Sequence, residues 1–285
     1  MKTIAIYHNK GGVGKTTTAV NLAAALRNKG KRVLLIDIDS QANSTFATGL
    51  IKFQFEEDDD LKDNNVYHLI SSGEFNFIPD IARKSKGFNN PEIDVIPSHI
   101  MLMQVQDSLS KIAASRFRLN TKIQQVQGKY DIILIDAPPS RDIYAEIALT
   151  TADYLIIPSD MKPFANQGLT NVKNFVSEVN ETRSSISKPK LEVLGVLPSK
   201  ILTNLKYLEF AFPRQKDAVL HRYELPVMDT IIYERVMLSN CVNKTIMMGN
   251  LDIPDPKSIF EFDRNADSVT EFRNLAFEVL QKIGE

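Results

Sequence analysis

The sequence predicts an α/β fold with a doubly wound, mostly parallel sheet and helices on both faces. Short and almost unbroken apolar runs recur along the 285 residues, and apolar residues between them follow helical spacing. Such runs are typical of strands that are buried on both faces, as in a parallel sheet covered by helices. The alternation continues along the whole chain, so we expect a single domain over residues 1–285.

The first predicted strand is followed by a glycine-rich turn. The apolar residues 4–7 precede the sequence Asn-Lys-Gly-Gly-Val-Gly-Lys-Thr-Thr at positions 9–17, and a helical pattern runs on to Arg27. Glycines let successive N–H groups point inward, and the positive helix end that follows adds attraction for an anion. We therefore predict a phosphate site, in which Lys15 reaches the terminal phosphates and the Thr16 hydroxyl holds Mg²⁺. The predicted phosphate-binding residues are Lys10, Gly11, Gly12, Val13, Gly14, Lys15, Thr16 and Thr17.

This turn departs from the usual phosphate-binding pattern at two positions. Asn9 stands where a glycine is expected five positions before Gly14, and a second lysine, Lys10, precedes the glycine pair. This is the deviant Walker A signature, and with it the sequence resembles the ParA/MinD family of P-loop ATPases, closest to ParA/Soj-type partition ATPases without an N-terminal DNA-reading domain. The alternative, a glycine-rich turn with exposed lysines, rarely combines these residues in this order after a strand.

The resemblance implies the roles of both lysines and the cofactors. Lys10 reaches across a homodimer, with ATP sandwiched between the subunits, to the partner's phosphates. Lys15 acts on the nucleotide of its own subunit. ATP or ADP and Mg²⁺ are the implied cofactors, and Lys10 and Lys15 are therefore candidate catalytic residues.

The second strand, residues 33–39, ends in a polar cluster that contains Asp37 and Asp39. Strand ends of this kind are where open α/β sheets bind ligands. The family carries Asp-x-Asp-Pro-Gln-x-Asn at this place, and Ser40 replaces the proline here. By resemblance, Asp39 orients or activates the attacking water, and Asp37 supports Mg²⁺. The alternative is a strand that ends in a solvated acidic turn.

The stretch after the second strand is less regular. We expect polar insertions near residues 52–65, which include the acidic run 56–60, and near residues 83–91. Between them, residues 66–70 predict a short helix. We interpret the acidic run as a solvated loop, and the alternative is an element that contacts a partner.

The middle of the chain supplies another acidic strand end. Residues 93–97 predict a strand, and the residues after it predict a core-facing helix. Residues 132–136 form the next strand, which ends in Asp136 and is followed by Ala-Pro-Pro-Ser. A carboxylate here can accept from Mg²⁺-bound water, as at a Walker B strand end. The apolar positions expected to face the core in that helix are Met101, Leu102, Val105, Leu109 and Ile112.

The last third of the chain continues the pattern. Strands are predicted at residues 154–158 and 191–197, and an amphipathic helix covers 269–283. By resemblance, Asn204 and Tyr233 lie near the adenine, although the family usually has proline where Tyr233 stands.

Composition excludes several classes of protein. The net charge is −1, so nucleic acid would have to bind to a local patch, and the single cysteine, Cys241, excludes a disulfide framework. No apolar run approaches the ~20 residues that span a bilayer, and we expect no signal peptide and no membrane partner. We expect a cytoplasmic protein that is associated with the nucleoid of a prokaryote.

The expected reaction is Mg²⁺-dependent ATP hydrolysis that is slow alone and stimulated by a ParB-like activator. The resemblance implies that ATP-driven dimerisation and nonspecific binding to double-stranded DNA partition or position a plasmid, chromosome or other large cargo. The family's DNA-facing arginine positions carry Glu234 and Met237 here, so a replacement patch is needed. Its candidates are Lys200, Lys206, Arg214, Lys216, Arg222, Arg235 and Lys244.

Two alternatives stay open. One is a MinD-like or other positioning switch that does not bind DNA, although the end of the chain, residues 280–285, lacks the basic amphipathic character of a membrane tail. The other is a nucleotide-binding scaffold with little turnover, because Ser40 and Tyr233 change the surroundings of the site.

Overall fold

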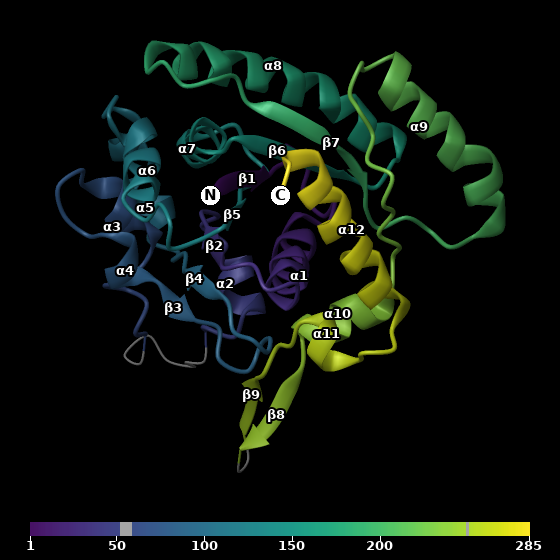
Figure 1. The fold of residues 1–285 in the computed structure, drawn as a ribbon, viewed down its shortest axis with the longest axis horizontal. Helices are drawn as coiled ribbons and strands as arrows, with labels where there is room; N and C mark the ends of the chain where they lie inside the picture. The colour runs from purple at the N-terminus through teal and green to yellow at the C-terminus, as the bar shows by residue number, and fades with distance from the viewer. Residues whose placement is uncertain (52–58, 249–250) are drawn as a thin grey trace.

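A computed structural model describes residues 1–51, 59–248 and 251–285. Its centre is a seven-stranded sheet in the order β3-β4-β2-β5-β1-β6-β7, in which only the pairing of β3 with β4 is antiparallel (Figure 1). The doubly wound, mostly parallel sheet predicted from the sequence is therefore confirmed. The strands are β1 Lys2–Ile6, β2 Val33–Asp37, β3 Arg83–Lys84, β4 Asp94–Ile96, β5 Ile132–Asp136, β6 Tyr154–Ser159 and β7 Glu192–Pro198.

Helices cover both faces of the sheet, because alternate residues of each strand feed two separate cores. In β5, Ile133 and Ile135 pack in one core, whereas Ile132 and Leu134 pack in the other. This two-sided burial explains why the strands read as unbroken apolar runs. The helices are α1 Lys15–Asn28, α2 Asn43–Ala47, α3 Val66–Ser71, α4 Ile78–Ile81, α5 Leu102–Ser110, α6 Ser115–Gln124, α7 Ile143–Thr151, α8 Pro163–Ser185, α9 Phe212–His221, α10 Val236–Val242, α11 Ile259–Phe262 and α12 Asp267–Ile283.

Several predicted helix boundaries follow from local signals. Helix α1 ends before Gly30, which has a left-handed φ of 84° that closes the helix without a Cβ clash. Helix α7 begins at an N-cap, Asp142, whose carboxylate accepts from the N–H groups of Tyr144 and Ala145. Within the described residues, none of the helices combines the length and apolar character that crossing a membrane requires.

The structure describes the two expected polar insertions to different extents. Residues 52–58 of the first lie outside the described residues. In the second, Arg83 and Lys84 form the edge strand β3, and Phe88 is buried and accepts from the N–H of Ser258 through its carbonyl. The segment 83–91 is thus packed into the domain, although it is rich in polar residues.

Two further elements differ from the sequence predictions. Helix α5 buries only Leu102 and Leu109, while Ile112 lies exposed beyond its end, so the predicted core face is narrower than expected. A hairpin formed by β8 Thr245–Met248 and β9 Leu251–Pro254 projects at the bottom of Figure 1, and the sequence did not indicate it.

Candidate active site

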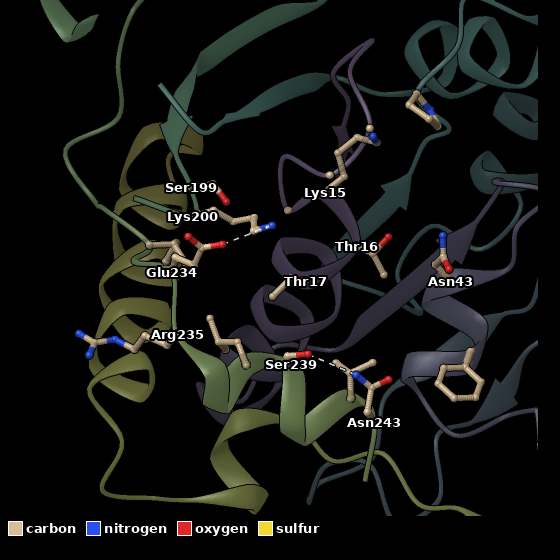
Figure 2. A pocket seen from close by; sticks show the side chains of 18 of the residues that line it. Lys15, Thr16, Thr17, Asn43, Ser199, Lys200, Glu234, Arg235, Ser239 and Asn243 are labelled. Atoms are coloured by element: carbon tan, nitrogen blue, oxygen red, sulfur yellow. Dashed lines mark hydrogen bonds and ion pairs between the residues drawn. The ribbon is translucent and has the colours of Figure 1, made fainter. Parts of the chain in front are cut away.

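The turn between β1 and α1 lies at the carboxyl edge of the sheet, beside the ends of β5 and β2. Gly12 and Gly14 take left-handed φ values of 76° and 89°, which other residues adopt only with strain. A Cβ on Gly14 would come within 2.5 Å of the Ser199 Oγ, whereas one on Gly12 would meet nothing within 4 Å. The turn is therefore packed on one side and opens on the other into the cavity shown in Figure 2.

Lys15 lies at the start of α1 and lines this cavity. Its side chain is mostly buried, and its Nζ donates to the Lys10 carbonyl over 3.2 Å. Burial lowers the pKa of Lys15, and the carboxylates of Asp136 and Asp39 oppose that change. An anion placed in the turn would therefore find an ammonium group that is desolvated and close by.

Two carboxylates end adjacent strands in register, Asp37 on β2 and Asp136 on β5. The Asp136 Oδ2 accepts from the Thr16 hydroxyl at 2.8 Å and from the Ser44 hydroxyl at 2.7 Å. Its Oδ1 is buried and has no hydrogen-bond partner. Burial raises the pKa of Asp136 to about 6, and burial together with repulsion from Asp136 raises the pKa of Asp37 to about 8. This pair of carboxyl groups would be stabilised by a nearby cation.

Asp37 is fully buried, and hydrogen bonds from neighbouring residues engage its carboxylate. Its Oδ2 accepts from both the N–H and the hydroxyl of Thr45, at 2.8 and 2.7 Å, and it does not line the cavity. These bonds connect Asp37 to α2, and its support for Mg²⁺, which the resemblance implies, stays a prediction. Thr16 and Asp136 fit a magnesium site better, because Mg²⁺ takes few protein ligands and keeps phosphate and water oxygens. No cluster of three or more histidine, cysteine or acidic side chains suited to a metal occurs among the described residues.

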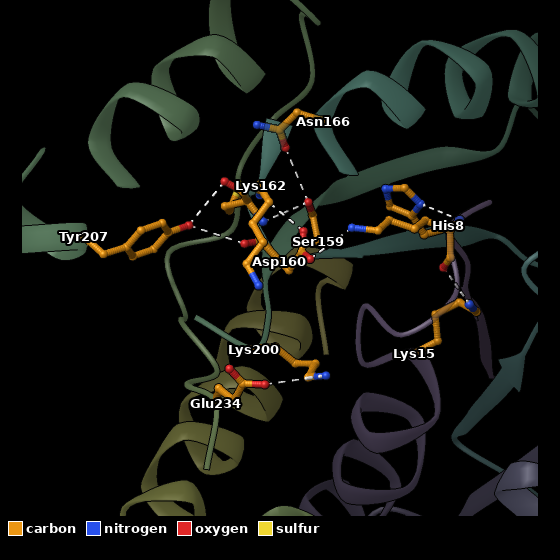
Figure 3. Close-up of polar contacts among 11 residues, drawn as sticks. His8, Lys15, Ser159, Asp160, Lys162, Asn166, Lys200, Tyr207 and Glu234 are labelled. Carbon is orange, nitrogen blue, oxygen red and sulfur yellow. Dashed lines mark hydrogen bonds and ion pairs between the residues drawn. The ribbon is translucent and has the colours of Figure 1, made fainter. Parts of the chain in front are cut away.

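Asp39 and Lys10 are held by contacts within the subunit. Asp39 lines the cavity, its Oδ1 accepts from the Gln41 N–H, and burial raises its pKa. The Lys10 Nζ lies 3.1 Å from the Asp160 Oδ2, and the backbone N–H of Lys10 donates to the Nδ1 of His8. Figure 3 labels both partners, Asp160 and His8. Lys10 thus turns towards its own subunit, at the side of the phosphate-binding turn.

The cavity has a volume of about 940 Å³, within the usual range for ligand pockets. Opposite the turn it is lined by Lys200 and by residues between Ile232 and Asn243, including Tyr233, as Figure 2 shows for Lys200 and Asn243. Asn204 is not among the lining residues, and its Oδ1 accepts from the Tyr207 N–H at 3.2 Å. Lining residues that the sequence did not single out are Phe46, Ser199, Val242 and Asn243.

The predicted basic patch is divided. Lys200 pairs with Glu234 at 3.7 Å, Arg235 pairs with carboxylates of α12, and Lys244 pairs with Asp255 at 3.4 Å. These three cations are therefore compensated by carboxylates, and Lys200 and Arg235 also line the cavity. The others lie on or beside α9 and the π-helical turn Tyr207–Ala211, and they are Lys206, Arg214, Lys216 and Arg222.

An inward-curled turn between the first strand and helix of a parallel sheet, with Lys15 and the Thr16–Asp136 pair beside it, defines a P-loop nucleotide-binding protein. The family model described as an AAA domain matches residues 1–193. An uncharacterized protein of Methanocaldococcus jannaschii is 30% identical over 99% of this chain and 100% of its own length. The chromosome partitioning protein ParA of Caulobacter vibrioides is 36% identical over 69% of this chain and 68% of its own, and the sporulation initiation inhibitor protein Soj of Bacillus subtilis is 37% identical over 63% and 66%.

Solved structures agree with these matches. A putative plasmid partition protein from Borrelia burgdorferi bound to AMPPNP has a TM-score of 0.70 and 27% identity over 99% of both chains. Cobyrinic acid a,c-diamide synthase from Mycobacterium smegmatis, with bound ADP and magnesium, shares the fold with a TM-score of 0.77 at 24% identity, over 100% of this chain and 96% of that one. This chain belongs to the ParA/MinD family of P-loop ATPases.

Proposed function

We propose that this protein is a Mg²⁺-dependent ATPase whose ATP-driven dimerisation positions a plasmid, a chromosome or another large cargo. The observation that carries the proposal is the arrangement around the turn, with Lys15 beside the curled amides and the Thr16 hydroxyl bonded to Asp136. The partition proteins among its relatives support the proposal that the cargo is a plasmid or a chromosome. We extend the proposal to a ParB-like activator and to a cytoplasmic location in a prokaryote.

The turn performs the binding step. Its backbone N–H groups donate hydrogen bonds to the phosphate chain, and Lys15 exchanges its contact with the Lys10 carbonyl for a phosphate oxygen. Thr16 and Asp136 would hold a Mg²⁺ ion, which would neutralise phosphate charge when bound. The phosphates then lie at the turn, so the nucleoside extends towards Tyr233 and α10 on the opposite wall.

Asp39 carries the hydrolytic step in this proposal. It lines the cavity close to Lys15, and its carboxylate is oriented by the Gln41 N–H at 3.0 Å. A carboxylate fixed in this way can orient a water molecule for in-line attack on the terminal phosphate. Lys10 completes the site only after it leaves Asp160 and reaches the phosphates of a second subunit, which makes the isolated subunit slow.

Binding and turnover of a fluorescent ATP analogue test this proposal. Lys15→Ala should abolish binding, whereas Asp39→Ala should bind ATP and release no phosphate. Lys31→Ala is a matched control, because Lys31 pairs with Glu285 at the surface. Undiminished binding by Lys15→Ala, or undiminished phosphate release by Asp39→Ala, would reject the roles assigned here.

A second candidate is a positioning switch of the same family that does not bind DNA. The pairing of Lys200, Arg235 and Lys244 with carboxylates favours it, since these cations are then less available to a phosphate backbone. Retention of duplex DNA by the ATP-bound protein, measured as salt is raised, distinguishes the two candidates. Absence of binding at low salt favours the switch without DNA.

A further inference from the structure

The wall of the cavity opposite the turn includes residues 232–235, and the segment 229–235 that carries them is held along two edges. On one edge it pairs with the chain beyond β7, because the N–H of Ile232 donates to the Pro198 carbonyl at 2.9 Å and the N–H of Glu234 donates to the Ile201 carbonyl at 2.8 Å. In an extended chain the intervening N–H groups point the other way. The second edge therefore needs acceptors of its own.

Two buried glutamates of α12 supply these acceptors. The Glu278 Oε1 and Oε2 accept from the N–H groups of Asp229 and Thr230, both at 2.9 Å. The Glu271 Oε2 accepts from the N–H of Tyr233 at 3.2 Å. Both glutamates are less than a tenth exposed. A helix thus takes the place of a neighbouring strand along this edge.

The spacing of the two glutamates matches the segment they hold. They are seven residues apart, or two turns, which separates them by about 10.5 Å along α12. The backbone from Asp229 or Thr230 to Tyr233 spans about 10–13 Å when extended. One face of α12 therefore meets the segment at both of its anchor points.

Arg235 ties the end of this segment to the same helix. Its Nε and Nη2 donate to the Glu271 Oε1 at 3.0 and 2.9 Å, and its Nη1 lies 2.9 Å from the Asp267 Oδ2. Figure 2 shows the guanidinium of Arg235 pointing away from the cavity towards a helix of the C-terminal region. This fork engages two carboxylates on successive turns of α12, which restricts the backbone at Arg235.

We propose that Glu271 and Glu278 are positioning residues of the nucleotide site, and that Arg235 links Glu271 to the wall of the cavity. Tyr233, Glu234 and Arg235 line the cavity, so the two α12 carboxylates set the distance between this wall and the phosphate-binding turn. The proposal rests on the proposed function, because it assumes that the nucleoside lies against this wall. It also reassigns Arg235 from the DNA-binding set to ion pairs with α12 of its own subunit.

The test compares two probes, a fluorescent ATP analogue and tripolyphosphate, each with Mg²⁺. Tripolyphosphate occupies only the turn, so it does not sense the wall. Glu271→Gln and Arg235→Ala should each weaken ATP binding about tenfold, the size expected when one charged hydrogen bond is lost. Tripolyphosphate affinity should change by less than about twofold, because a tenfold change would require the loss of a whole charged hydrogen bond and this ligand does not reach the wall.

Glu181→Gln on the exposed side of α8 is the control and should match the unmodified protein with both probes. Equal ATP affinity in all variants would overturn the positioning role while leaving the proposed function intact. An equal loss of ATP and tripolyphosphate binding would also overturn it, because the effect would then be a general loss of folded protein. Failure of the unmodified protein to bind ATP would instead reject the proposed function, and this inference with it.

Discussion

A histidine at the base of the phosphate-binding turn helps to fix its backbone. His8 is fully buried, and its Nδ1 accepts from the Lys10 N–H at 3.0 Å. Burial, with the charge of Lys15 as the next cause, lowers the pKa of His8 to about 4. The ring is therefore neutral at pH 7, which is the form that can accept this hydrogen bond.

The depressed pKa of His8 predicts a loss of stability in mild acid. In the unfolded chain the pKa is near 6.5, so the unfolded state binds the proton first as the pH falls from 6.5 towards 4. The stabilisation is complete above 6.5, and about 2 kcal/mol of it should disappear between pH 7 and pH 5. Urea unfolding at the two pH values should show that His8→Asn loses less stability than the unmodified protein.

The exposed His221 is the control for this prediction, and His221→Asn should keep the full pH dependence. Asp37 and Asp136 act in the opposite direction, since their raised pKa values favour the folded state as the pH falls from 8. Both carboxyl groups are present in every variant compared. The difference in pH dependence between His8→Asn and the unmodified protein therefore reports on the histidine alone. Identical pH dependence of His8→Asn and the unmodified protein would contradict the role of burial.

Among the elements, the end of α7 depends on a side chain from α8. Arg183 is almost fully buried, and its Nη1 donates to the carbonyls of Leu149, Thr150 and Ala152. Its Nε donates to the Pro189 carbonyl at 2.8 Å. The last carbonyls of a helix have no partners within the helix, so Arg183 supplies the donors that α7 lacks.

Arg183→Leu should reduce the free energy of unfolding by about 3 kcal/mol, because it leaves several buried carbonyls without donors. Guanidinium chloride unfolding measures this loss. The folded fraction should bind ATP normally, since Arg183 is remote from the residues that line the cavity. Arg264→Leu is the control, because Arg264 is exposed and pairs only with Glu261 three residues earlier. A change as small as that of Arg264→Leu would show that water satisfies the α7 carbonyls.

Helix α9 concentrates the cations that remain available to DNA. No ion pair involves Arg214 or Lys216 within the part of the chain that the structure describes, whereas Lys244 pairs with Asp255. Reversing Arg214 and Lys216 to glutamate should weaken retention of duplex DNA by the ATP-bound protein and flatten its salt dependence. Lys244→Glu should have a smaller effect. Equal effects of the two changes would show that α9 has no special part in DNA binding.

At the scale of the whole molecule, the sequence predicted the parts that follow local patterns. Strands such as β5 are buried on both faces, so each appears as an unbroken apolar run, and left-handed positions such as Gly14 are marked by glycine. Contacts between distant segments leave no such pattern. The ion pair between Arg235 and Glu271 joins residues 36 positions apart, and an arginine that pairs with a carboxylate of its own subunit looks the same in sequence as one that faces DNA.

Local patterns also do not show which contacts Asn204 and Asp37 make in the fold. Asn204 stands at the position that the resemblance assigned to the adenine, yet its Oδ1 accepts from the Tyr207 N–H at the start of the π-helical turn. Asp37 ends a strand beside Asp136 as predicted, and only the fold shows that Thr45 occupies its carboxylate. Local sequence patterns thus predicted which polar residues stand at the strand ends. Packing between distant segments decides which of these residues line the cavity.

The largest-scale prediction concerns the state of assembly. In the isolated subunit Lys10 lies 3.1 Å from Asp160, so it does not yet serve a nucleotide. If Lys10 acts on the phosphates of a second subunit, binding of ATP should drive dimerisation, and hydrolysis should reverse it. Asp39→Ala with ATP and Mg²⁺ should therefore have twice the 32.1 kDa subunit mass in light scattering, whereas the same variant with ADP should be monomeric. Lys10→Ala combined with Asp39→Ala should bind ATP yet remain largely monomeric, because the phosphate charge at the interface then lacks its counter-charge. A single-subunit mass for Asp39→Ala at tens of micromolar protein with saturating ATP would leave Lys10 without a phosphate to contact, and the dimerisation switch would be rejected.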